Sequence, residues 1–315
     1  MAFKIDVSAL PSPFSFLDKK PDDLEKEFKM LKNESFDSPP KPTDPEFKDF
    51  STALTPENKA RNRYKNILAN NTTRVKLEKE RDGSDYINAN HCLNGRVIIS
   101  QGPLDNDDDY EHHHADFYDM LWTNHCSAIA MVSSFVQNCS IKCSYYYPTI
   151  KEKDLIAGPY TISASSDIAP TEEDVSLKKL GIEITKLHIE KKGEESRLVT
   201  HYYYPNWGDF KGTTTEVVAA LARRLLKENK PLIHCSAGIG RSGTLAAVME
   251  CYDRIIKKKY SDTLVPDVVN ALRVERRGCV QTKEQYQTIY NTLQALVKEN
   301  AESSSCHESG KSEKE

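Results

Sequence analysis

The segment from Pro231 to Thr244, PLIHCSAGIGRSGT, combines a candidate cysteine nucleophile with a candidate anion-binding loop. Two apolar residues typical of a short strand lead into a glycine-containing loop, and the loop opens a helix near Ser242. Backbone N–H groups in such a loop, aided by the helix dipole, bind anions. Cys235 begins the loop and Arg241 closes it. These surroundings lower a thiol pKa to roughly 3.5–7.5, and the planar guanidinium fits two phosphoryl oxygens, so the spacing predicts a thiolate aimed at phosphorus.

The segment has two other possible interpretations. A cysteine and an arginine at this spacing also arise by chance, and the cysteine is then a buried structural thiol. Eleven consecutive residues, HCSAGIGRSGT, in a strand–loop–helix context favour the nucleophile instead. Nucleotide binding is disfavoured because the Gly-Lys-Ser/Thr sequence of an ATP-binding loop is missing.

Composition excludes several classes of protein. Of the 315 residues, 38% are hydrophobic and 29% charged, which indicates a polar folded protein and neither a collagen-like nor a disordered chain. Forty-three basic and 47 acidic residues give a net charge of −4, so no global charge favours nucleic acid or an anionic membrane. No apolar run approaches the ~18–20 residues of a membrane span, and the N-terminus lacks a signal-peptide core. Eight cysteines are too few for a disulfide scaffold, so we expect free thiols in the cytoplasm.

The elements around this segment predict an α/β fold. Strands are expected over residues 74–77, 85–90, 96–100, 128–133 and 141–147, with a hairpin over 187–204. Helices are expected over residues 216–228, 244–258, from Pro266 to near Gly278, and from Thr282 onward. Strands followed by helices, with a crossover at residues 231–258, predict a central mixed, twisted sheet flanked by helices. The phosphate-binding loop then lies between a central strand and a helix.

The two ends of the chain differ from the middle. Residues 1–21 are predicted to be a flexible arm and residues 22–298 one folded domain. The domain begins with a docking helix and a Pro-rich connector, which together occupy residues 22–45. Residues 299–315 lack aliphatic side chains beyond alanine and are predicted to be disordered.

Several segments outside the loop match one protein family in the same order. They are NRYKNI (62–67), DYINAN (85–90), SQGPL (100–104), FYDMLW (117–122), KCSYYYP (142–148) and VQTKEQY (280–286). Over roughly residues 22–298 the chain resembles the tyrosine-specific, cysteine-dependent protein phosphatases, with a non-receptor-like catalytic domain. The resemblance implies hydrolysis of phosphotyrosine in proteins by a single domain, without a metal or an organic cofactor. The expected partners are phosphotyrosine-containing proteins and not nucleic acid, and the expected state is a monomer.

The resemblance also implies the roles of the catalytic residues. Cys235 attacks phosphorus and forms a phosphocysteine. Asp209, in WGDF, protonates the leaving phenolate and later acts as a base for water. Ser242 helps the thiolate to leave in the second step. Arg241 and the loop backbone hold the phosphoryl oxygens, the loop being Ser236, Ala237, Gly238, Ile239 and Gly240.

Four further residues have implied roles, and three of them have alternatives. Gln281, with Gln285, orients the water, although Gln285 could be only a helix cap in the box Thr282-x-x-Gln285. Tyr64 stacks on the substrate ring, or is simply a core aromatic. Lys142 contacts the acid loop, or is a solvated strand lysine.

Two histidine features are expected to have structural roles. His234 precedes the nucleophile and is expected to orient the loop by hydrogen bonds instead of transferring protons. The run His112–His114 lies near Glu111 and Asp116, but it lacks the i, i+4 spacing that places two imidazoles on one helical face. A solvated acidic loop is therefore favoured over a metal site there.

Four positions depart from the family pattern. In the acid loop, Gly208 replaces the usual proline and Lys211 replaces a common glycine. Asn66 replaces an aspartate that binds the substrate backbone, and Gln137 replaces a glutamate that pairs with the loop arginine. A tyrosine phosphatase has two rivals, the second of which is suggested by the altered acid loop. One is a dual-specificity or lipid phosphatase with the same loop, and the other is a catalytically weak phosphotyrosine-binding module.

Overall fold

The computed structural model describes residues 14–31, 38–81, 83–104, 110–165, 168–209 and 211–309. Its strands are β1 Arg74–Arg81, β2 Ser84–Cys92, β3 Val97–Ser100, β4 Ala128–Met131, β5 Val136–Gln137, β6 Ser140–Ile141, β7 Leu155–Ala157, β8 Tyr160–Ala164, β9 Glu183–Lys191, β10 Arg197–Tyr203 and β11 Leu232–His234. Its α-helices are α1 Pro21–Met30, α2 Pro56–Lys59, α3 Tyr110–Thr123, α4 Glu172–Lys179, α5 Thr215–Leu225, α6 Gly240–Ile256, α7 Leu264–Glu275 and α8 Lys283–Ser309. Short 3₁₀ turns occupy Ser15–Leu17, Phe47–Phe50 and Thr52–Leu54.

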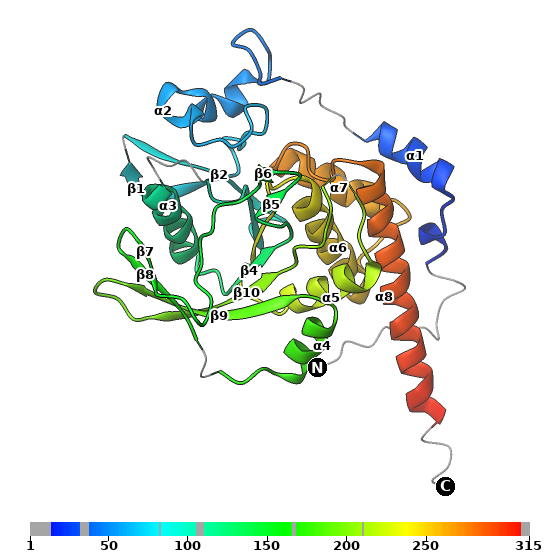
Figure 1. The fold of residues 1–315 in the computed structure, drawn as a ribbon. Coiled ribbons are helices and arrows are strands. Elements are labelled where there is room, and N and C mark those ends of the chain that lie inside the picture. The colour runs from blue at the N-terminus through cyan, green and yellow to red at the C-terminus, as the bar shows by residue number, and fades with distance from the viewer. Residues whose placement is uncertain are drawn as a thin grey trace.

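A mixed nine-stranded sheet in the order β1-β2-β3-β11-β4-β10-β9-β8-β7 forms the centre of the described part of the chain. The four central strands β3, β11, β4 and β10 are parallel, and the outer pairs are antiparallel. Helices α5 to α8 cover one face of the sheet and α3 lies on the other (Figure 1). This arrangement confirms the predicted fold class.

The central strands are apolar on both faces because both faces are covered. In β3, Ile99 packs into the core under α5 to α8, whereas the adjacent Ile98 packs into the core under α3. In β11, Ile233 packs into the core under α5 to α8, and Leu232 packs into the core under α3. The strand β11, which directly precedes Cys235, is therefore packed on both faces and hydrogen-bonded to β3 and β4 at its two edges.

Two predictions for the chain ends were partly wrong. The 3₁₀ turn before α1 buries Phe16 and Leu17, so residues 14–21 of the predicted flexible arm are docked, and residues 1–13 lie outside the described residues. Helix α8 continues from the domain into the predicted disordered tail and ends at Ser309. Asn300 anchors this extension by donating to the Tyr252 hydroxyl over 3.1 Å. Residues 310–315 lie outside the described residues.

Two local predictions were also wrong. Residues 142–147 do not continue a strand, because their backbone N–H groups bond to loop carbonyls: Lys142 N–H donates to Phe135 O over 2.7 Å. The histidine run is helical and not a solvated loop, since it lies on α3. His113 and His114 are buried there, and His114 Nε2 lies 2.8 Å from Ser144 Oγ. Burial lowers the pKa of His114 to about 4.

Candidate active site

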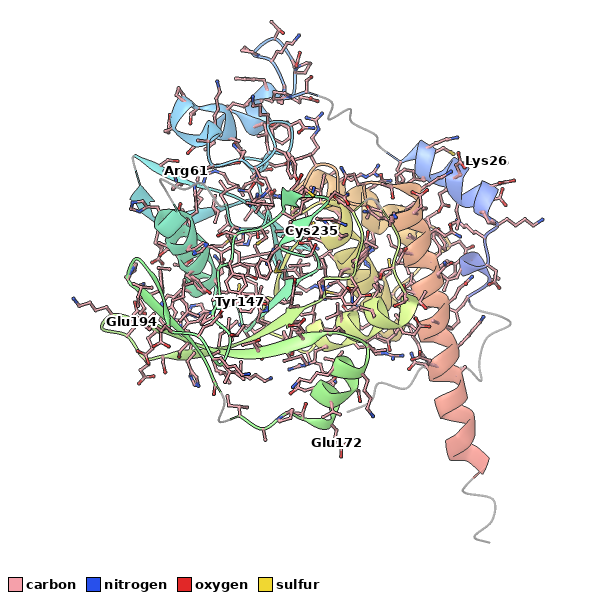
Figure 2. All side chains as sticks on the ribbon, in the orientation of Figure 1. Lys26, Arg61, Tyr147, Glu172, Glu194 and Cys235 are labelled. Atoms are coloured by element: carbon pink, nitrogen blue, oxygen red, sulfur yellow. The ribbon has the colours of Figure 1, made fainter. Side chains whose placement is uncertain are left out.

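Cys235 directly follows β11, and the loop of residues 235–239 joins this strand to α6. The cysteine lies in the interior, between the sheet and the helices, and is 3% exposed (Figure 2). Gly238 has a left-handed backbone (φ 68°), and a Cβ at this position would lie 2.0 Å from Ser100 O. Only glycine fits such a close approach of two backbones. The loop can therefore rest directly on β3, with the Gly238 N–H donating to Cys235 Sγ over 3.3 Å.

The surroundings of Cys235 favour its thiolate. Burial alone would raise the thiol pKa, but the Arg241 charge, the Ser242 hydroxyl and N–H, and the Gly238 N–H outweigh burial, so the pKa lies below its usual value. Two other buried thiols behave in the opposite way: burial raises the pKa of Cys126 and of Cys279 to about 12. The structure thus distinguishes one thiol chemically from its buried neighbours.

Arg276 holds the loop from beneath and was not identified from the sequence. Its fully buried guanidinium donates to Gly238 O over 2.6 Å and to Ala237 O over 3.0 Å. The same group donates to the side-chain oxygens of Asn88 and Asn90 on β2, over 2.9 and 2.6 Å. Because the loop carbonyls turn toward Arg276, the intervening N–H groups are free to face a bound anion.

His234 lies in a buried hydrogen-bonded chain behind the nucleophile. Its Nδ1 lies 3.2 Å from Cys235 O, and its Nε2 lies 2.7 Å from the Tyr146 hydroxyl. That hydroxyl also lies 2.6 Å from His201 Nε2. Burial lowers the pKa of His234 to about 4, so the imidazole is neutral near neutral pH. These contacts agree with the predicted orienting role.

The acid loop is folded over Arg241. The Arg241 guanidinium donates to Trp207 O over 2.9 Å, and its Nη2 lies 3.2 Å from Asp209 Oδ1. Lys142 Nζ lies 3.5 Å from Asp209 Oδ2, which is the contact that the resemblance implied. Gln137 Oε1 accepts from Arg241 at a long 3.4 Å. Asp209 thus lies beside the cysteine loop, between two cations.

Three buried polar atoms in this site have no hydrogen-bond partner of good geometry among the described residues: Arg241 Nε, Ser242 Oγ and Gln285 Nε2. Unsatisfied buried donors are rare in folded proteins, so each calls for an explanation. Arg241 Nε is therefore a candidate donor to a bound anion. The Ser242 hydroxyl is one of the groups that lower the pKa of Cys235.

Tyr64 forms a wall of the cavity above Cys235. Its hydroxyl lies 2.9 Å from Ser236 Oγ, so the ring runs from the rim to the loop. Gln101, from the SQGPL segment, fixes the preceding residues: Arg63 N–H donates to its Oε1 over 3.0 Å, and its Nε2 donates to Arg61 O over 2.8 Å. Since Tyr64 lines an open cavity, it is not simply a core aromatic.

The cavity brings most of the predicted site residues together. Its volume is about 220 Å³, and its lining residues are Tyr64, Asn66, Ile67, Lys142, Asp209, Cys235, Ser236, Ala237, Gly240, Arg241 and Gln281. A second cavity of about 240 Å³, near Pro231 at the opposite end of β11, contains none of the predicted site residues.

Gln281 lines the cavity, whereas Gln285 lies behind it and caps α8. Gln285 Oε1 accepts from the Gln281 N–H over 2.8 Å and from the Thr282 N–H over 3.3 Å, which confirms the predicted capping box. Val280, just before them, has φ 61°, a strained value for a β-branched residue. Arg273 stabilises that conformation by donating to Val280 O over 2.8 Å. Arg273, like Arg276, was not identified from the sequence.

A protein-family model described as protein-tyrosine phosphatase matches residues 58–295. This match covers more than half of the chain and includes every predicted site residue. The chain belongs to the protein-tyrosine phosphatase family, as the sequence motifs predicted.

Individual relatives agree with this assignment. The chain is 29% identical to the human tyrosine-protein phosphatase non-receptor type 2 over 277 residues, covering 84% of this chain and 60% of that protein. It is 32% identical to tyrosine-protein phosphatase 3 of Dictyostelium discoideum over 272 residues, covering 79% of this chain and 26% of that protein. It is 30% identical to the mouse non-receptor type 20 enzyme over 256 residues, covering 78% of this chain and 55% of that protein. The chain thus spans well under two thirds of each of these relatives.

The described residues include no helix that is long and apolar enough to cross a membrane. The same residues contain no cluster of three histidine, cysteine or acidic side chains arranged to hold a metal ion.

Proposed function

We propose that this protein hydrolyses phosphotyrosine in proteins through a phosphocysteine intermediate. The observation that carries the proposal is the buried Cys235 thiol of lowered pKa, which shares one cavity with Arg241 and Asp209. Cys235 Sγ attacks phosphorus, and the bond from phosphorus to the phenolic oxygen breaks as Asp209 gives that oxygen a proton. Arg241 and the loop N–H groups stabilise the charge on the phosphoryl oxygens.

The second step releases phosphate. Water attacks the phosphocysteine, Asp209 accepts a proton from that water, and the thiolate leaves with help from the Ser242 hydroxyl. Gln281 orients the water, since it lines the cavity on the side of α8. Gln285 supports Gln281 through the backbone hydrogen bond described above. No metal ion or organic cofactor takes part in this scheme.

Cavity depth supports tyrosine over serine and threonine. One tyrosine side chain, that of Tyr64, reaches from the rim to Ser236 on the loop, so the cavity is about one tyrosine side chain deep. A phosphoserine is shorter and stops before Cys235. Lys65 is exposed beside Tyr64 and favours acidic residues next to the phosphotyrosine, an effect that weakens with salt. We further propose that the substrates are phosphotyrosine proteins of the cytoplasm and that the enzyme acts as a monomer.

The test is turnover of matched phosphotyrosine, phosphoserine and phosphothreonine peptides, together with a phosphoinositide, by the wild-type protein and the Cys235→Ser variant. The proposal expects phosphotyrosine hydrolysis by the wild type alone. Comparable kcat/KM on phosphotyrosine and phosphoserine peptides would indicate a dual-specificity enzyme. Binding of phosphotyrosine peptide without turnover would indicate a phosphotyrosine-binding module.

A further inference from the structure

Two of the departures from the family pattern, Gly208 and Lys211, contact each other. A Cβ placed on Gly208 would meet three carbons of the Lys211 side chain: Cδ at 3.3 Å, Cγ at 3.7 Å and Cβ at 3.8 Å. The aliphatic stem of Lys211 therefore covers the space that a side chain at position 208 would occupy. Lysine stems pack on apolar surface in this way while the ammonium stays in water.

The backbone of Lys211 closes the same loop. Its N–H donates to Gly208 O over 3.3 Å, and its carbonyl accepts from the Trp207 indole over 2.9 Å. Trp207 is fully buried, and its own carbonyl accepts from Arg241. Lys211 is thus attached to both residues that precede Asp209.

The end of the loop that follows Lys211 is also fixed. A Cβ on Gly212 would lie 2.7 Å from Thr288 Oγ1 on α8, so this part of the chain rests closely against that helix. Asp209 therefore lies in a short loop that is buried at one end, at Trp207, and seated on α8 at the other. Gly208 lies between the two ends, and its backbone has much conformational freedom because glycine lacks a Cβ.

We propose that Lys211 is a positioning residue for the acid loop. Its stem replaces the side chain that Gly208 lacks, and its backbone groups close the loop, so that Asp209 is held facing Arg241. The inference rests on the proposed role of Asp209 as the general acid. It explains why glycine and lysine occur together here: Lys211, three residues further along the chain, fills the space next to Gly208 that a larger side chain at position 208 would fill.

The experiment compares Lys211→Met, which keeps an unbranched stem without charge, with Lys211→Gly, which removes the stem. Lys192→Gly, at an exposed lysine in the turn between β9 and β10, is the matched control. The kcat/KM value is measured on a phosphotyrosine peptide and on an aryl phosphate with an activated leaving group. Acid catalysis matters most when the leaving group is poor, so a misplaced Asp209 is detected as a selective loss on the peptide.

Lys211→Gly is expected to lower kcat/KM on the peptide by about three- to tenfold, with a smaller loss on the activated substrate. Lys211→Met and Lys192→Gly are expected to stay within about twofold of the wild type. Adding Gly208→Pro should help the Lys211→Gly variant more than it helps the wild type, where the ring meets the lysine stem.

Three outcomes would overturn the inference: equal losses in Lys211→Met and Lys211→Gly, equal losses on both substrates, or additive effects of the two substitutions. An unchanged rate in Asp209→Ala on the peptide is a different result. It would remove the general acid of the proposed function, whatever the lysine variants do.

Discussion

Gly240 is the position at which one added methyl group should separate the two chemical steps. A Cβ there would lie 2.8 Å from Gln285 Nε2 and 3.0 Å from Gln281 Oε1. These contacts are shorter than ordinary van der Waals contacts, so at least one amide must move by some tenths of an ångström. Both amides are the ends of flexible side chains, so the backbone of the anion-binding loop keeps its place.

The Gly240→Ala variant should fold. Alanine is favoured over glycine in a helix by about 0.5–1 kcal/mol. Disturbing the Gln285 cap costs about 0.5–2 kcal/mol, in the range measured for other helix caps. The free energy of unfolding should therefore fall by at most about 1.5 kcal/mol, a small part of the roughly 5–15 kcal/mol of a typical domain. Urea denaturation of the variant and the wild type measures this difference.

The variant should be slow only in the second step. The Gly240 N–H, Arg241, Asp209 and Cys235 all remain for the first step, whereas Gln281 is displaced from the water that it orients. Misplacement of a catalytic group by about 1 Å costs up to about 10²-fold in rate. Phosphocysteine should then accumulate, and stopped-flow measurements should show a burst of phenol that approaches one equivalent per enzyme.

Mass spectrometry after acid quenching should detect the phosphorylated Cys235 in Gly240→Ala, and Gln281→Ala should behave in the same way. Slow release of phenol without a burst and without phosphoenzyme would mean that the methyl group added in Gly240→Ala disturbs the anion-binding loop itself. The same result in Gln281→Ala, which leaves that loop unchanged, would refute the assignment of Gln281 to the second step.

Three further predictions follow from the site. Gly238→Ala should cost about 2–5 kcal/mol, from left-handed strain and a clash with Ser100 O, and a urea midpoint equal to that of the wild type would contradict this. Below the usual thiol pKa range, iodoacetamide should label Cys235 before Cys279, because the pKa of Cys235 is lowered whereas that of Cys279 is raised; activity should rise with pH there as the thiolate forms, and equal labelling would disprove the selective ionisation. Asp209→Ala should lower kcat/KM on a phosphotyrosine peptide by about 10²–10⁴, and an unchanged kcat/KM on that peptide would remove Asp209 from the mechanism.

The contiguous part of the site was predictable from the sequence, and the supporting part was not. Cys235, Arg241 and the loop between them are consecutive, so their strand–loop–helix context can be recognised locally. Arg276 contacts Gly238 and the distant Asn88, and no local pattern distinguishes it from a surface arginine. Its role depends on the order of the strands, which spacing does not reveal.

The wrong strand over residues 142–147 has a related cause. Aromatic residues favour strands because they pack well on a half-buried surface. Here the rings pack on one another instead: the Tyr145 ring lies 4.8 Å from that of Phe135 and stacks on that of Tyr147. Packing between the rings therefore gives these aromatic residues a half-buried surface without the backbone hydrogen bonds of a strand. The prediction of a disordered tail was wrong for a different reason. Asn300 contacts Tyr252, and helix α8 continues past this contact, but composition alone does not predict the helix.

The place of β11 between β3 and β4 has a consequence for synthesis of the chain. Both neighbouring strands precede β11 by at least 100 residues, so each keeps an unpaired apolar edge until Leu232–His234 emerges from the ribosome. Such edges are where nascent chains aggregate or meet chaperones. The strand that closes the sheet is followed directly by Cys235. An incomplete chain that ends before this strand therefore lacks both a continuous sheet and the reactive thiol, and the nucleophile appears only as the sheet is completed.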